Sequence, residues 1–238
     1  MNVVVIGSGV MGPGIAQVFL MGGHRVVMND IKMEALAEGT KALRNSLNLF
    51  VEKGIADLDV EALMGNFQTM TSLEEAVKDA DLVIEAVPEV IPIKQQVYEN
   101  LDRFCPKDTV IVSNTSALPL PEIFPHFRPC NFFVAHFMNP PQIIPLVEIV
   151  KNDKTDPEKV AWLRAELERC GKKPIVINQF VKGFLTNRLQ TAMAREALYL
   201  YEKGIVSLED LDIANTACIG FKSAWQGTVE TMDYIGLD

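Results

Sequence analysis

A glycine-rich turn near the N-terminus constrains this chain more than any other feature. The apolar run Val3–Ile6 predicts a strand buried on both faces. The glycines that follow it in the spacing G-x-G-x-x-G are Gly7, Gly9 and Gly12. An apolar helix is expected over 11–22, then a strand over 25–28 that ends at Asp30. Strand, turn, helix, strand and acid in this order predict a dinucleotide-binding α/β unit.

Each part of this segment has a physical role in binding a pyrophosphate. Gly7 permits the tight turn, Gly9 lets the backbone approach the ligand, and Gly12 lets helix and strand pack closely. The N-terminus of the helix presents free N–H groups and a partial positive charge. We therefore expect the whole turn to contact the cofactor, including Val10 and Met11.

Asp30 indicates which dinucleotide binds. A carboxylate at the end of the second strand accepts a hydrogen bond from a ribose 2′-OH and repels a 2′-phosphate, so NAD is favoured over NADP. Lys32 is the only nearby cation, and one lysine does not reverse that preference. Asp30 can also act as the N-cap of a helix that begins near Lys32, and the two roles are compatible.

The composition bounds the class of protein. The 238 residues are 48% hydrophobic and 22% charged, as in a globular protein with a substantial core. The net charge of −9 argues against a nucleic-acid partner. No apolar run is long enough to span a membrane and no signal segment precedes the first strand, so we expect a cytoplasmic protein. The four cysteines match no metal-binding spacing, and no metal is expected.

Strands alternate with helices along the chain and predict a parallel sheet with right-handed crossovers. Further strands are expected at 67–70, 82–84, 109–112, 132–137, 146–150 and 174–177. Helices are expected at 33–53, 93–104, 156–170 and 181–201, and helix-capping pairs at Ser72 with Glu75 and at Ser207 with Asp210. We therefore predict a Rossmann-type, doubly wound, mainly parallel sheet over 1–178, followed by a smaller all-helical domain over 179–238.

The three histidines are the candidates for acid–base chemistry. His24 follows two glycines and is expected at the surface, and His126 is expected in a loop. His136 lies near the end of a predicted strand, and Glu148 follows it on the next strand. A carboxylate beside an imidazole fixes its orientation and raises its basicity. Taken by themselves these two residues fit a buried structural pair equally well, and such pairs are the more common case.

Further motifs along the chain resemble those of the L-3-hydroxyacyl-CoA dehydrogenase family over essentially its whole length. They are Gly7–Ala16, Glu85–Glu89 with Lys94, Ser113–Leu118, His136–Pro140, Pro145–Ile149, Gly183–Leu189 and Met232–Asp238. Several independent motifs in one order are more specific than a glycine turn alone. The resemblance implies NAD-dependent, reversible oxidation of an L-3-hydroxyacyl-CoA to the 3-ketoacyl-CoA, as in fatty acid β-oxidation.

The resemblance also implies roles for individual residues. His136 would take the proton of the 3-hydroxyl, Glu148 would orient His136, and Ser116 and Asn187 would hold the reacting oxygen. Residues that would line the ribose and nicotinamide side of NAD are Glu89, Lys94 and Asn139. Those that would contact substrate on the CoA side are Ser46 and Lys53, which a seven-residue spacing places on one helix face. Lys53 fits a solvated surface lysine as well.

Two departures from the family pattern leave the substrate open. The segment Lys222–Thr228 stands where the family usually carries Pro-Met-Gly-Pro, near the acyl side. Family members also continue for several helices beyond Asp238, so we expect an incomplete C-terminal domain, which in the family supports a homodimer. One alternative is the same chemistry on a free hydroxy acid, such as a sugar acid or a carnitine-like compound. Another is a catalytically idle NAD-binding protein.

Overall fold

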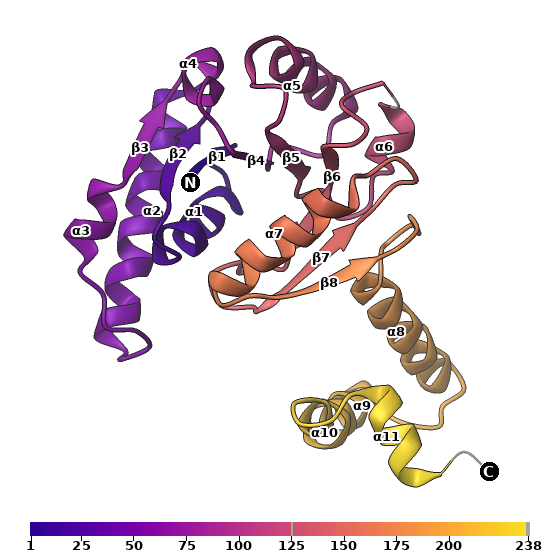
Figure 1. Ribbon diagram of the computed structural model, residues 1–238. Coiled ribbons are helices and arrows are strands. Elements are labelled where there is room, and N and C mark those ends of the chain that lie inside the picture. The colour runs from indigo at the N-terminus through magenta and orange to yellow at the C-terminus, as the bar shows by residue number, and fades with distance from the viewer. Residues whose placement is uncertain (125, 237–238) are drawn as a thin grey trace. The chain divides into compact units, whose positions relative to one another are not determined.

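The computed structural model describes residues 1–124 and 126–236. The chain divides into two compact units, Met1–Leu185 and Thr186–Asp238, which are described separately. Figure 1 shows the strands and helices of both. The domain boundary that the sequence places near Asn178 stays a prediction. The boundary between the two compact units falls after Leu185.

The first unit is built on an eight-stranded sheet with the order β3-β2-β1-β4-β5-β6-β7-β8. The strands are β1 (Asn2–Ile6), β2 (Arg25–Asn29), β3 (Phe67–Met70), β4 (Leu82–Glu85), β5 (Val110–Ser113), β6 (Phe132–Phe137), β7 (Leu146–Val150) and β8 (Lys173–Ile177). All neighbours are parallel except β6 and β7, which are antiparallel. Because the connections diverge from β1 to β2 on one side and towards β4 on the other, the predicted Rossmann-type sheet is confirmed.

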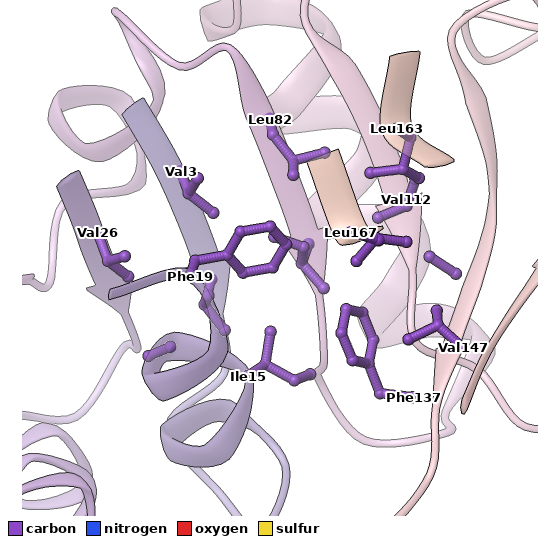
Figure 2. Close-up of a cluster of buried hydrophobic side chains, with 14 of the residues drawn as sticks. Val3, Ile15, Phe19, Val26, Leu82, Val112, Phe137, Val147, Leu163 and Leu167 are labelled. Atoms are coloured by element: carbon purple, nitrogen blue, oxygen red, sulfur yellow. The ribbon is translucent and has the colours of Figure 1, made fainter. Parts of the chain in front are cut away.

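Helices cover both faces of this sheet. They are α1 (Gly12–Met21), α2 (Met33–Glu52), α3 (Val60–Gly65), α4 (Leu73–Val77), α5 (Ile91–Phe104), α6 (Leu120–Ile123) and α7 (Pro157–Arg169). Val3 and Val5 of β1 pack in the same cluster as residues of α1, α2 and α7. Figure 2 shows part of this cluster, with Val3, Ile15 of α1 and Leu163 of α7 among the labelled side chains. Val4 and Ile6 face the other way, in a cluster with residues of α4, α5 and α6. The period of two along β1 therefore separates two cores.

The second unit consists of helices. They are α8 (Thr186–Glu202), α9 (Leu208–Ala214), a π-helical turn (Asn215–Gly220), α10 (Phe221–Ser223) and α11 (Thr228–Ile235). None of the described residues in these elements is buried. The last two residues of the motif Met232–Asp238 lie outside the described residues. Along the described chain, no helix is both long and apolar enough to cross a membrane.

Some local sequence patterns predicted the helix ends correctly and others did not. Ser72 and Ser207 cap their helices through bonds from the N–H groups three residues on, as predicted. The helix expected from 181 begins only at Thr186, and the prediction of its start was wrong. Gly183 and Phe184 both have positive φ, which a right-handed helix cannot contain. The short helices α3 and α6 were not predicted, because four to six residues are too few to show a helical apolar period clearly.

Candidate active site

The glycine turn follows β1 at the edge of the sheet where the connections diverge. Gly7 has a φ of +103°, and a Cβ there would lie 2.6 Å from the carbonyl oxygen of Ala86. A Cβ on Gly12 would overlap the carbonyl oxygen of Gly7. Gly9 is exposed, and a Cβ there would meet no protein atom within 4 Å. Gly7 and Gly12 are thus required by the protein's own packing, whereas Gly9 leaves room for a ligand before α1.

Asp30 reaches into this turn from the end of β2. Its Oδ2 accepts hydrogen bonds from the backbone N–H of Ser8 at 3.0 Å and from the Ser8 hydroxyl at 2.9 Å. Its Oδ1 accepts from the backbone N–H of Lys32 at 3.2 Å, but Lys32 itself is the N-cap of α2, so Asp30 is not the cap. A carboxylate has about four accepting positions, so Asp30 retains capacity for a ribose hydroxyl. Of the other turn residues, Val10 is exposed and Met11 half-buried.

The antiparallel pairing of β6 and β7 sets His136 directly opposite Glu148. The Nδ1 atom of His136 lies 2.9 Å from Oε2 of Glu148. Glu148 is fully buried, and the His136 side chain is 9% exposed. The other carboxylate oxygen accepts from the backbone N–H of Leu185 at 3.1 Å. A carboxylate held at both oxygens fixes the ring, with the Nδ1 proton directed at Glu148 and Nε2 left as the proton acceptor.

Phe184 completes the surroundings of His136, and sequence reasoning missed it. It is fully buried, packs with Val134 and Val150, and its ring centroid lies 5.5 Å from that of His136. Its φ of +49° is strained for a residue with a side chain. The available signal was its place in the motif Gly183–Leu189, directly after a glycine.

Ser116 and Asn139 follow the carboxyl ends of β5 and β6, and both are exposed. The backbone N–H of Ser116 donates to Oε1 of Glu89 at 2.8 Å. Asn114 joins this loop to the strand of His136, because its Oδ1 accepts from the backbone N–H of Phe137 at 2.8 Å. The structure therefore holds the Ser116 loop beside the end of the strand that carries His136. Asn187 is the second residue of α8 and belongs to the other unit.

A buried polar cluster lies at the end of β4. The Nζ atom of Lys94 donates to both oxygens of Glu85, at 2.8 and 3.0 Å, and both side chains are almost fully buried. The hydroxyls of Tyr98 and Ser113 each donate to Glu85 Oε2 at 2.6 Å. Burial, and then the charge of Glu85, raise the pKa of Tyr98. The sequence analysis predicted a role for Lys94. It did not indicate that Tyr98 and Ser113 bind the same carboxylate as Lys94.

Glu89 stands at the solvent side of that cluster. Its Oε1 accepts from the Thr115 hydroxyl at 2.6 Å and from the Ser116 N–H, and its Oε2 lies 3.2 Å from Lys94 Nζ. Burial alone would raise the pKa of Glu89, but the bonds from Thr115 and Ser116 and the charge of Lys94 outweigh burial and lower that pKa. Glu89 is thus held as a carboxylate.

The two residues expected on the CoA side are not equally placed. Ser46 is half-buried on α2, and its hydroxyl accepts from Gln142 Nε2 at 3.4 Å. Lys53 is the C-cap residue after α2, 61% exposed and 3.1 Å from Glu52. Lys53 is therefore accessible to an anion, although it pairs with Glu52, and its position also suits a solvated surface lysine.

His24 was expected at the surface, and that prediction was wrong. It is buried against Phe19, with Nε2 3.7 Å from Oε2 of Glu166, and burial lowers its pKa. It precedes β2 at the amino end of the strand, so it lies at the edge of the sheet opposite the glycine turn. Across the described residues, no group of His, Cys, Asp and Glu could hold a metal ion.

The sheet order, the glycine turn at its switch point and an oriented imidazole at the same edge define a dinucleotide-dependent α/β dehydrogenase. Residues 2–180 match the NAD-binding domain of 3-hydroxyacyl-CoA dehydrogenase, and residues 183–238 match the C-terminal domain of that family. The chain belongs to the 3-hydroxyacyl-CoA dehydrogenase family, and its cofactor is NAD.

Known relatives span the full length of this chain but differ in substrate. The 5-formyl-3-hydroxy-2-methylpyridine 4-carboxylate 5-dehydrogenase of Mesorhizobium japonicum is 37% identical over 100% of this chain and 76% of its own. A solved structure of an NAD⁺-dependent enzyme of that name has a TM-score of 0.90, covering 100% of this chain and 76% of that one. A probable 3-hydroxybutyryl-CoA dehydrogenase of Bacillus subtilis is 36% identical, covering 100% and 82%. The human mitochondrial hydroxyacyl-coenzyme A dehydrogenase is 35% identical, covering 100% and 76%.

Replacing Asp30 tests the choice of cofactor. Asp30→Ala should weaken NAD binding by about 1–3 kcal/mol, because a hydrogen bond to a charged acceptor is lost. Part of that loss comes from releasing Ser8, so Ser8→Ala serves as the matched control. Titration of parent and variants with NAD and NADP gives the result. Equal affinity of the parent for both cofactors would contradict the role of Asp30.

Proposed function

We propose that this protein oxidises the 3-hydroxyl of an L-3-hydroxyacyl-CoA to the ketone, reversibly and with NAD. The observation that carries the proposal is the His136–Glu148 pair, held at 2.9 Å near the carboxyl end of β6. Because β6 is linked to β1 through parallel neighbours, this end lies on the same edge as the glycine turn. A proton acceptor on the edge where the cofactor binds suits an alcohol dehydrogenation.

The residues divide the chemistry between them. When bound, NAD would supply the acceptor for the hydride of C3. His136 takes the hydroxyl proton at Nε2, since Nδ1 faces Glu148, and the electron pair of the O–H bond becomes the second bond of the carbonyl. Glu148 stabilises the resulting imidazolium and keeps the ring in place. Ser116, on the loop after β5, holds the reacting oxygen, and the family resemblance assigns the same role to Asn187.

The same proposal assigns the cofactor-contacting residues. The backbone of the turn approaches the pyrophosphate, and Asp30 accepts from the adenosine ribose. Glu89 and Asn139 line the nicotinamide half, with Lys94 behind Glu89. The turn residues concerned are Gly7, Gly9, Val10, Met11 and Gly12.

Dimerisation through the helical unit is also part of the proposal, because the described helices there bury no residue.

A free acid is the second candidate substrate, and two observations favour it. The relative from Mesorhizobium japonicum is named for a pyridine carboxylate, not for a CoA ester. The segment Lys222–Thr228 also departs from the family pattern, and its Trp225 is largely exposed. An assay of NADH absorbance with acetoacetyl-CoA, compared with free 3-hydroxy and pyridine carboxylic acids, separates the two. A higher kcat/KM for the free acids would replace the CoA proposal.

Lys53 offers a test within the protein. The net charge of −9 repels a polyanion at long range, so CoA binding needs local cations. Lys53→Glu should raise the KM for acyl-CoA and make it more sensitive to salt, with NAD affinity unchanged. Lys107→Glu is the matched control, since Lys107 is 78% exposed and precedes β5 at the opposite edge of the sheet. Equal KM values for the two variants would remove Lys53 from the site.

A further inference from the structure

Glu85 lies on the strand next to β1, at the level where the glycine turn begins. It ends β4 and pairs with Ile6, the last residue of β1. The next residue, Ala86, donates its N–H to the Ile6 carbonyl at 2.8 Å, and its own carbonyl oxygen is what a Cβ on Gly7 would meet. The segment after β4 is therefore packed against the turn, at the switch point where a dinucleotide binds.

The Glu85 carboxylate is fully buried, and both of its oxygens accept hydrogen bonds. Its Oε1 accepts from Lys94 Nζ and, at 2.9 Å, from the backbone N–H of Val87. Its Oε2 accepts from Lys94, Tyr98 and Ser113. A buried charge is tolerated when it is paired and hydrogen-bonded in this way. Replacement of such a pair by apolar residues often preserves stability, so stability alone does not explain why the end of an apolar strand carries it.

Two chains of hydrogen bonds lead from Glu85 to the loop of Ser116. In the first, Lys94 bridges Glu85 to Glu89, whose other oxygen accepts from Thr115 and from the Ser116 N–H. In the second, the Ser113 hydroxyl donates to Glu85 and accepts from the Thr115 N–H at 3.2 Å. The chains meet at Thr115, so the contacts form a closed ring. A closed ring fixes the loops after β4 and β5 relative to each other.

We propose that Glu85 is a positioning residue, which through Lys94 and Ser113 holds the Glu89 carboxylate and the Ser116 loop in place for cofactor and substrate. Glu89 is 43% exposed, so the ring ends in a group that solvent or a ligand can reach. The part that concerns Ser116 rests on the proposed function. The part that concerns Glu89 rests only on NAD binding.

Glu85→Gln is the central variant, because glutamine keeps the shape but removes the charge and one accepting oxygen. We expect turnover to fall about a hundredfold, as when a reacting group is displaced by about 1 Å. In a Ser116→Ala background the same change should cost less than about threefold, because the group that Glu85 positions is already gone. Losses that multiply instead would show that Glu85 acts elsewhere and would overturn the proposal.

Cofactor binding gives a readout without substrate. The fluorescence of bound NADH should report an affinity about tenfold weaker in Glu85→Gln, the cost of one hydrogen bond to a charged group. In a Glu89→Ala background, Glu85→Gln should leave NADH affinity unchanged. Equal losses in both backgrounds would overturn the link to Glu89. If the parent oxidises none of the tested substrates, the proposed function fails while this cycle still decides the role of Glu85.

Loss of folding is separated by two further variants. Tyr98→Phe removes one donor to Glu85 and keeps the charges, so it should shift turnover in the same direction by less. Arg128→Met removes a buried cation that binds the carbonyls of Leu101, Cys105 and Pro106 at the other edge of the sheet. It should lower the melting temperature without changing turnover or NADH affinity. If Arg128→Met lost turnover in proportion to its fall in melting temperature, the effect of Glu85→Gln on turnover would also be explained by lost stability. Glu85 would then be a structural residue and not a positioning residue.

Discussion

His136→Gln should lower turnover by about two to four orders of magnitude, which is the usual contribution of a positioned general base. The amide keeps the size of the ring but cannot take the hydroxyl proton. NAD affinity should be nearly unchanged, because His136 faces the substrate in the proposed site. Steady-state kinetics and NADH fluorescence titration measure the two quantities. Turnover equal to that of the parent would contradict the mechanism.

The partner and a control sharpen this test. Glu148→Gln should act in the same direction by loosening the ring, and the double variant should lose much less than the product of the single losses, because the pair acts as a unit. The chain supplies a second buried histidine–glutamate pair, His24 and Glu166, at the opposite edge of the sheet. His24→Gln should therefore affect stability but not turnover.

The sequence predicted the sheet well because its strands are short apolar runs between turn residues. Buried parallel strands need continuous hydrophobicity, so β1, β4 and β5 stand out even in isolation. The glycine turn was equally readable, since backbone geometry at Gly7 and Gly12 excludes any side chain. The helix start misplaced near Val181 shows the limit: an apolar pattern continued through a segment whose backbone is left-handed at Gly183 and Phe184.

The candidate site was only partly predictable, because its contacts cross between strands. Spacing alone placed Glu148 on the strand after His136, but their direct pairing depends on the antiparallel register of β6 and β7. The hydrogen bonds to Glu85 could not be predicted for the same reason, since Tyr98 and Ser113 come from a helix and another strand. His24 misled because neighbouring glycines suggested a surface turn, whereas packing against Phe19 buries it.

Two of the motif glycines, Gly9 and Gly12, should respond differently to alanine, and that difference separates folding from binding. Gly12→Ala should lower the free energy of unfolding by about 3 kcal/mol, the upper range for overpacking, because its Cβ would overlap the Gly7 carbonyl. Gly9→Ala should not lower stability, since no protein atom lies within 4 Å of its Cβ and its φ is not positive. It should nevertheless weaken NAD binding about tenfold to a hundredfold, because the methyl group occupies the approach of the pyrophosphate.

Gly65→Ala is the control for a methyl group in open space. Gly65 ends α3, its Cβ would meet nothing within 4 Å, and its φ is not positive, so alanine should stabilise the fold by about 0.4–1 kcal/mol. Chemical denaturation and NAD titration of the three variants give the result. If Gly9→Ala bound NAD as tightly as the parent, the open space before α1 would not be where the pyrophosphate sits. The pyrophosphate contact would then have to be assigned to other backbone N–H groups of the turn.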